Sequence, residues 1–67
     1  MTMPHTLNTP NAILQAALTK ETQARDFYAD LAAHCHVAYV KELLLTLQDE
    51  EFRHMRMIEK MLARQED

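Results

Sequence analysis

The sequence has no glycine, no tryptophan and a single cysteine, and its only two prolines, Pro4 and Pro10, lie near the N-terminus. Because glycine and proline interrupt helices most strongly, nothing breaks a helix after residue 10. The lone Cys35 cannot form a disulfide within the chain or supply a Cys-x-x-Cys redox motif. The composition therefore indicates an all-α protein, and any electrons it uses must come from a partner or a substrate.

Long apolar runs and an excess of positive charge are also missing. The longest unbroken run of strongly apolar residues is Leu43 to Leu45, whereas a bilayer-spanning helix needs about 20 residues. Seven basic residues stand against ten acidic ones, giving a net charge of −3, and the basic residues are scattered singly. Residues 1–8 lack the apolar centre of a signal peptide. We therefore expect a cytoplasmic protein, free or inside a protein compartment, that binds no nucleic acid and no membrane.

A chain of 67 residues is limited to one small domain and buries little apolar surface within a single copy. Phe27, Leu45 and Phe52 lie off the main apolar stripes described below, and they add surface that a two-chain bundle does not easily hide. We therefore expect a homo-oligomer that is at least a dimer, with room for a larger assembly.

A first helix is expected over about residues 10–35, preceded by a flexible N-terminal arm at residues 1–8. Thr9 suits the cap, because its hydroxyl can accept a free backbone N–H, and Pro10 suits the first helical position. Mostly apolar residues recur in this helix in alternating steps of three and four, the spacing that keeps a narrow stripe of side chains towards a neighbouring helix. Glu21 is its only charged residue. The stripe consists of Leu14, Ala17, Glu21, Ala24, Tyr28, Leu31 and Cys35.

A second helix is expected over about residues 39–65. Its stripe consists of Val40, Leu44, Leu47, Glu51, His54, Ile58 and Met61. The two stripes are out of phase by two residues, which predicts a turn at about 36–38. Folding back there puts Glu21, Glu51 and His54 at one level, because all three lie about 14 to 17 residues from the bend and a helix rises about 1.5 Å per residue. Two such antiparallel hairpins are expected to pair into a four-helix bundle.

The segment Glu51-Phe52-Arg53-His54 is an E-x-x-H motif, in which residues three apart share a helix face and can bind one metal ion together. The motif alone is weak, since a charged helix can contain it by chance. Two hairpins, however, would supply two copies of Glu21 and two E-x-x-H motifs, which is the ligand set of di-iron and di-manganese carboxylate bundles. Four glutamates also balance two divalent cations in an interior whose stripes carry no lysine or arginine.

The oxygen-rich ligand set with one imidazole per metal favours iron, with two ions per pair of subunits. Manganese and zinc are the substitutes that the same ligands accept. A plainer interpretation pairs Glu21 with Arg25 one helical turn away, which would make the glutamate a surface residue.

Two segments carry a resemblance to a known family. In Glu21-Thr22-Gln23-Ala24-Arg25-Asp26-Phe27-Tyr28, a glutamate precedes an alanine by three positions and a tyrosine by seven. Residues 40–47 form an apolar run that leads into Glu50-Glu51-Phe52-Arg53-His54. Both patterns are similar to the two ligand helices of rubrerythrins, which are ferritin-like di-iron carboxylate proteins, and the resemblance covers residues 13–62 without a gap.

The resemblance implies a ferritin-like four-helix bundle whose di-iron centre reacts with dioxygen or peroxide. Glu21, Glu51 and His54 match ligand positions and are the candidate catalytic and metal-binding residues, and Tyr28 matches a tyrosine that hydrogen-bonds a ligand carboxylate. A rubrerythrin holds all four bundle helices in one chain and usually adds a cysteine-ligated iron domain, both of which this sequence lacks. The encapsulated ferritins are more similar in this respect, because they use one hairpin and build the site between two subunits.

The function expected from these observations is that of an oxidoreductase of ferroxidase or peroxidase type. It would oxidise Fe(II) with dioxygen or peroxide, using Fe(II) as substrate or an external electron donor. The alternative is a non-catalytic metal-binding or structural oligomerisation module with the same site. A coiled-coil adaptor without metal would require Glu21 and Glu51 to point into solvent.

Overall fold

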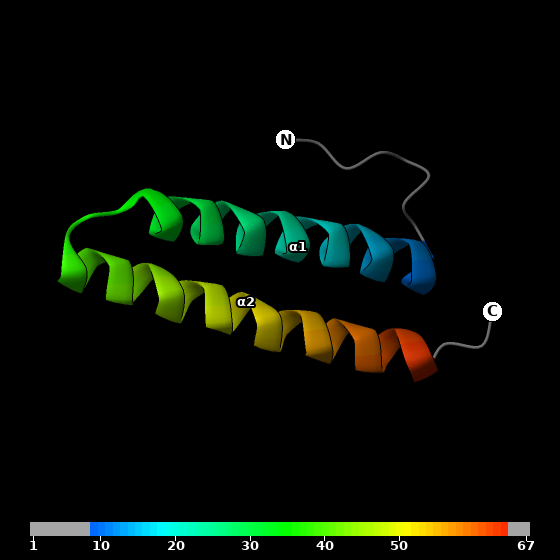
Figure 1. Cartoon of the computed structure of the whole chain (residues 1–67). Helices are drawn as coiled ribbons and strands as arrows, with labels where there is room; N and C mark the ends of the chain where they lie inside the picture. Colours follow the sequence, from blue (N-terminus) through cyan, green and yellow to red (C-terminus); the bar gives the residue numbers. More distant parts are fainter. Residues whose placement is uncertain (1–8, 65–67) are drawn as a thin grey trace.

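A computed structural model describes residues 9–64 and shows two α-helices folded back on each other as an antiparallel hairpin (Figure 1). Helix α1 spans Pro10–His34 and helix α2 spans Ala38–Arg64. The prediction of an all-helical hairpin is therefore confirmed. The predicted N-terminal arm, and the predicted end of the second helix at residue 65, lie outside the described residues.

The first helix begins at a capped terminus. Thr9 has an extended backbone, with φ of −103° and ψ of 150°, and its side-chain oxygen accepts a hydrogen bond of 3.1 Å from the Ala12 N–H. The Thr9 carbonyl accepts the first helical bond from the Ile13 N–H at 2.9 Å. Pro10 follows at the first helical position, where its missing N–H costs nothing. These local bonds fix where α1 starts.

The connection between the helices is only three residues long, at 35–37. Cys35 leaves the helical conformation, with φ of −90° and ψ of 128°, while its N–H still reaches the Ala32 carbonyl at 3.3 Å. On the far side of the turn, the Val37 carbonyl accepts the first bond of α2 from the Lys41 N–H at 2.9 Å. Such a short turn makes α1 and α2 direct antiparallel neighbours, so residues equally far from it meet.

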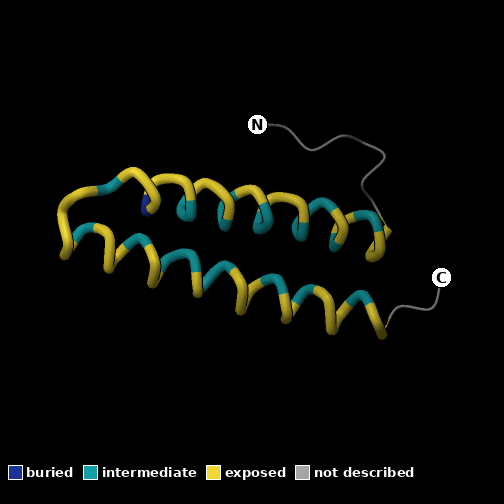
Figure 2. Tube along the Cα trace, in the orientation of Figure 1, coloured by how far each residue is buried: buried dark blue, intermediate teal, exposed yellow. Residues whose placement is uncertain are grey.

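The hairpin has almost no core of its own. Ala32, next to the turn, is the only described residue that is buried, with 2% of its surface exposed. The other described residues are half-buried or exposed along both helices (Figure 2). Within residues 9–64, neither helix combines the length and apolar character needed to cross a membrane. A hairpin that buries so little has most of its packing energy still to gain from other chains.

Three of the large exposed apolar side chains on each helix share one regular spacing. On each helix the second lies 14 residues and the third 18 residues after the first, which is close to four and five whole turns, so each set forms one row. Around each helix axis, the row lies roughly a third of a turn away from the residues that face the other helix. The direction of this rotation, viewed from the N-terminus of each helix, is the same for α1 and α2. Because the helices are antiparallel, both rows lie on one side of the hairpin, here called the apolar face. Its members are Ile13, Phe27, Leu31, Leu43, Met57 and Met61.

Candidate metal centre

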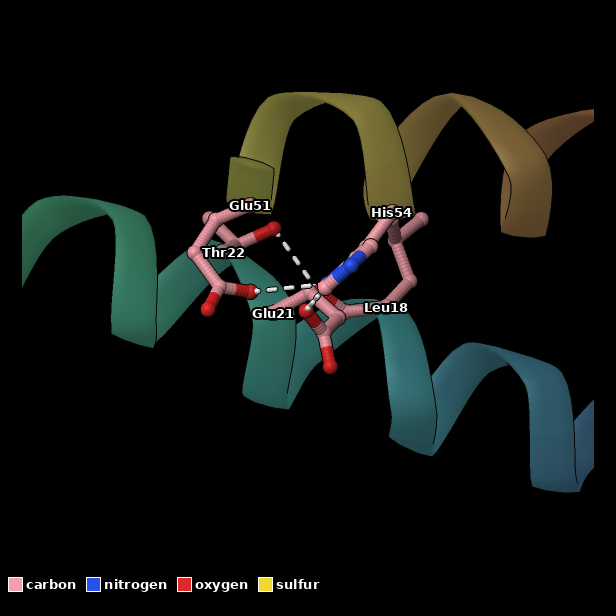
Figure 3. A network of polar contacts seen from close by, with 5 residues as sticks. All are labelled: Leu18, Glu21, Thr22, Glu51 and His54. Atoms are coloured by element: carbon pink, nitrogen blue, oxygen red, sulfur yellow. Dashed lines mark hydrogen bonds and ion pairs between the residues drawn. The ribbon is translucent and has the colours of Figure 1, made fainter. Parts of the chain in front are cut away.

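The structure brings together one glutamate from α1 and a glutamate and a histidine from α2 (Figure 3). The His54 Nδ1 atom lies 3.1 Å from a Glu21 carboxylate oxygen and 3.4 Å from a Glu51 carboxylate oxygen. One candidate ligand atom from each residue lies within 4.8 Å of the others. We call Glu21, Glu51 and His54 the Glu-Glu-His cluster.

Position along the helices explains the convergence. Glu51 and His54 are three residues apart and therefore share a face of α2. Glu21 lies as far before the turn as Glu51 lies after it, and the short turn keeps the two helices in step. The sequence predicts that these three residues lie at the same height along the two helices, and in the structure their side chains are in contact. Their roles as metal ligands and catalytic residues remain predictions.

Arg25 does not pair with Glu21. Its guanidinium lies 2.8 Å from the Asp26 carboxylate and 5.2 Å from the centre of the Phe52 ring on α2. Phe52 lies on the side of α2 opposite to the apolar face, so the Arg25 cation–π contact ties the helices together away from the cluster. The plainer interpretation, in which Arg25 neutralises Glu21, is therefore wrong. Glu21 has His54 as its ionisable neighbour instead.

The distances fit a bound cation. Metal–oxygen and metal–nitrogen bonds in proteins are about 2.0–2.2 Å long, so two ligand atoms on opposite sides of one ion lie about 4.2 Å apart. The cluster atoms, within 4.8 Å of one another, need only a small movement to share an ion. Two carboxylates and one imidazole form an oxygen-rich donor set that suits iron or manganese. Within residues 9–64, no lysine or arginine pairs with the cluster to take the place of the cation.

The three groups shift one another's protonation. A hydrogen bond with the Glu51 carboxyl, followed by the effect of His54, lowers the pKa of Glu21. The Glu21 carboxylate raises the pKa of Glu51, and desolvation adds to the rise. The hydrogen bond to Glu21 also raises the pKa of His54 above its ordinary value of 6.5. In the metal-free hairpin, therefore, a proton shared by the cluster offsets part of the negative charge that a bound cation would neutralise.

The metal-free protein is expected to lose stability as the pH rises past the pKa of His54. Because folding raises this pKa, the stabilisation from His54 is complete below pH 6.5 and is lost as the pH rises through the raised value. The lowered pKa of Glu21 gives a stabilisation that is complete above pH 4.5 and lost as the pH falls through the lowered value. Glu51, whose pKa is raised, gives a stabilisation that is complete below pH 4.5 and lost as the pH rises through the raised value. The metal-free protein should therefore lose stability as the pH rises through the raised pKa of His54 and as it falls through the lowered pKa of Glu21.

Metal-loaded protein should show the opposite trend, because the metal can bind only the unprotonated imidazole. Thermal unfolding at about pH 5.5 and about pH 8 should give a falling melting temperature for protein in chelator and a rising one for protein with Mn(II). The variant His54→Gln should weaken both trends. A chelated parent protein that becomes more stable between these two pH values would show that the cluster does not hold this proton.

Exposure differs across the cluster in an informative way. The side chain of Glu51 is 17% exposed, that of Glu21 30% and that of His54 49%. His54 follows Leu43 of the apolar face by 11 residues, about three turns, so its exposed edge lies on that face. The cluster is thus closed towards the hairpin's interior and open towards the apolar face.

Two neighbours of the cluster have other partners. Tyr28 is half-buried and packs edge-on against Phe27, with ring centres 5.6 Å apart. Within residues 9–64 its hydroxyl forms no hydrogen bond with a cluster carboxylate, so its supporting role remains a prediction. Thr22, which the sequence reasoning did not consider, lies beside Glu21 and donates to the Leu18 carbonyl at 2.8 Å (Figure 3). A threonine inside a helix commonly donates its hydroxyl hydrogen to the carbonyl four residues earlier, so this bond uses the Thr22 donor and Thr22 is not counted as a member of the cluster.

Comparison with known proteins gives one result for the family. The family model described as rubrerythrin matches residues 12–67, a span that contains all three cluster residues. Neither the curated proteins nor the solved structures gave a match. The rubrerythrin family usually binds iron, in agreement with the donor set described above. By this match over most of its length, the chain belongs to the rubrerythrin family.

Proposed function

We propose that this protein is a di-iron carboxylate oxidoreductase of ferroxidase or peroxidase type, whose site is shared between two subunits. The observation that carries the proposal is the convergence of Glu21, Glu51 and His54 from two helices. In a member of the rubrerythrin family, this donor set is the one expected to hold iron.

A second copy of the chain completes the site. One hairpin offers two carboxylates and one imidazole, which are too few ligands for two ions. Two hairpins offer four carboxylates and two imidazoles, and their negative charges match two divalent cations. The cluster opens towards the apolar face, so a copy that covers this face also encloses the cluster. The ferritin-like four-helix bundle is therefore a dimer of hairpins.

The protein residues have separate tasks in this site. Glu21 and Glu51 supply negative charge that offsets the higher charge of oxidised iron. His54 presents Nδ1, the ring nitrogen that lies against both carboxylates, as its ligand atom once it has lost its proton. Each bound Fe(II) ion would supply one electron, so that two ions together would reduce dioxygen to peroxide, or peroxide to water, and become Fe(III). The apolar side chains around the opening exclude bulk water when the second copy docks.

The test is iron oxidation by the full chain. Fe(II) added without oxygen, followed by air or peroxide, should give a rapid absorbance increase near the ultraviolet that saturates at two Fe(II) per two chains. Fe(II) is then either a substrate that leaves as ferric product or a resident ion that an external donor reduces again. Repeated additions of Fe(II) distinguish these cases. An oxidation rate equal to that in buffer would leave only a metal-binding or structural module.

A further inference from the structure

The apolar face carries both a projecting ring and a hollow that can receive one. The ring is that of Phe27, a residue that is 59% exposed and whose only aromatic contact among the described residues is with Tyr28. A shallow hollow with an almost entirely apolar surface lies nearer the start of the same helix. It is lined by Ile13, Ala16, Ala17 and Lys20.

The four residues of the hollow have a specific spacing. They occupy positions i, i+3, i+4 and i+7 of α1, which is the four-residue hole that accepts a side chain from a neighbouring helix in knobs-into-holes packing. Two of the four are alanines, which lets a partner helix approach closely. The methylene stem of Lys20 lines one end and leaves its ammonium group at the rim, where it can lie over an aromatic ring.

The ring and the hollow lie on opposite sides of the cluster. Phe27 follows Glu21 by six residues, about 9 Å along the helix, and the centre of the hollow precedes Glu21 by about seven ångströms. The point midway between them is therefore within one residue of Glu21. A two-fold axis that crosses α1 at this point exchanges the two positions, as a symmetric dimer requires of residues that contact each other.

We infer that two chains pair with α1 antiparallel to the partner's α1, and that Phe27 of each chain fills the hollow of the other. The inference rests on the proposed function, since the second copy is the one that completes the metal site, and it adds how that copy docks. The same axis passes at the level of the cluster, so a single symmetric arrangement fills both hollows and joins both halves of the site. The two α2 helices then lie side by side with Leu43 near the partner's Met57.

The other way to stack the apolar faces places α1 beside the partner's α2. At the level of Phe27 this arrangement offers Leu43 of α2, which projects from its helix and has no comparable hollow. Phe27 would then meet another projecting side chain, and the hollow of α1 would stay unfilled. Unfilled apolar space forfeits dispersion contacts and so disfavours this pairing.

Disulfide cross-linking distinguishes the two arrangements, because a disulfide forms only between cysteines whose Cα atoms lie within about 7 Å. In a full chain carrying Cys35→Ser, the pair Phe27→Cys with Ala16→Cys should form a covalent dimer under mild oxidation. The pair Phe27→Cys with Leu43→Cys is the matched control and should remain mostly monomeric on a denaturing gel. Single-cysteine variants measure random collisions.

Each outcome decides the question. At a protein concentration at which sedimentation shows both double variants to be dimeric without the ring, cross-linking of 27 to 16 above the single-cysteine level supports the antiparallel α1 pairing, whereas cross-linking of 27 to 43, or of neither pair, overturns it. Sedimentation of the unmodified protein separates this failure from that of the proposed function. A dimer that binds iron without the 27-to-16 cross-link leaves the shared site intact and removes only the docking arrangement, whereas a monomer removes both.

Ring removal gives a second measurement. Phe27→Ala should raise the dimer dissociation constant at least about tenfold, since truncation of a central aromatic anchor usually has an effect of this size. Phe52→Ala is the matched control, because Phe52 lies on the other side of the hairpin under Arg25. Equal dissociation constants for the two variants would contradict the assignment of Phe27 to the hollow.

Discussion

Replacing Glu51 with alanine is expected to slow iron oxidation by at least about 100-fold. Even the replacement of a residue that only hydrogen-bonds to a metal ligand usually lowers metal affinity or activity by about 10- to 100-fold. Glu51 is the least exposed member of the cluster, and its carboxylate lies 3.4 Å from the Nδ1 atom of His54. In a symmetric dimer the change removes two of four carboxylates, so both ions lose a ligand. Stopped-flow absorbance after mixing Fe(II)-loaded protein with oxygenated buffer measures the rate.

The matched control is Glu59→Ala, which removes an exposed carboxylate from the same helix two turns further on. It should oxidise iron at the parent rate. Because both changes replace glutamate with alanine, a difference between them reports the position and not the lost charge. Parent-like rates in both variants would remove the cluster from the reaction.

Removing the metal should lower the melting temperature by about 10 to 20 °C. A ligand that binds the folded chain at 100 times its dissociation constant adds about 2.7 kcal/mol, and each kcal/mol shifts the midpoint of a domain of this size by about 4 to 8 °C. The effect should be large here, because Ala32 is the only described residue that is buried. Circular dichroism at 222 nm, a standard helix signal, follows the transition in protein with chelator and with Mn(II).

Glu51→Ala provides the control for this measurement as well. The variant should melt at nearly the same temperature with and without Mn(II), whereas Glu59→Ala should keep the full difference. If Mn(II) stabilises Glu51→Ala as much as the parent, the metal binds elsewhere on the chain.

The helices could be predicted from the sequence because their signals are local. Without glycine, and with no proline after Pro10, nothing interrupts a helix over most of the chain, and Thr9 with Pro10 marks a start. The turn had no such marker. It was inferred from the two-residue phase slip between the stripes, and the structure has it at 35–37. A stripe repeats with the helical period, so a change of phase reveals a bend that residue types do not.

The meeting of the cluster residues could also be inferred, since distance from a bend translates into height along an antiparallel pair. The choice of partner by Arg25 could not. Its spacing from Glu21 allows an ion pair on the helix surface, yet it takes Asp26 and the ring of Phe52 on α2. That choice depends on the rotation of α2 about its own axis, and no residue near Arg25 in the sequence encodes this rotation.

The division of the exposed apolar residues between two sides of the hairpin needed the structure for the same reason. Sequence periodicity groups Phe27 with Ile13 on one helix, but only the packing of α1 against α2 shows that Leu43 and Met57 lie on the same side as they do. That side is where His54 remains open. The functional interpretation of the cluster therefore depends on what covers this face.

The central claim, that two chains share one two-metal centre, is tested most directly by native mass spectrometry of the full chain loaded with Fe(II) in the absence of oxygen. We expect a dimer that carries two iron ions and loses them when Glu51 is replaced by alanine. A monomer that binds one ion by itself, or a dimer whose iron content is unchanged by Glu51→Ala, would contradict the account.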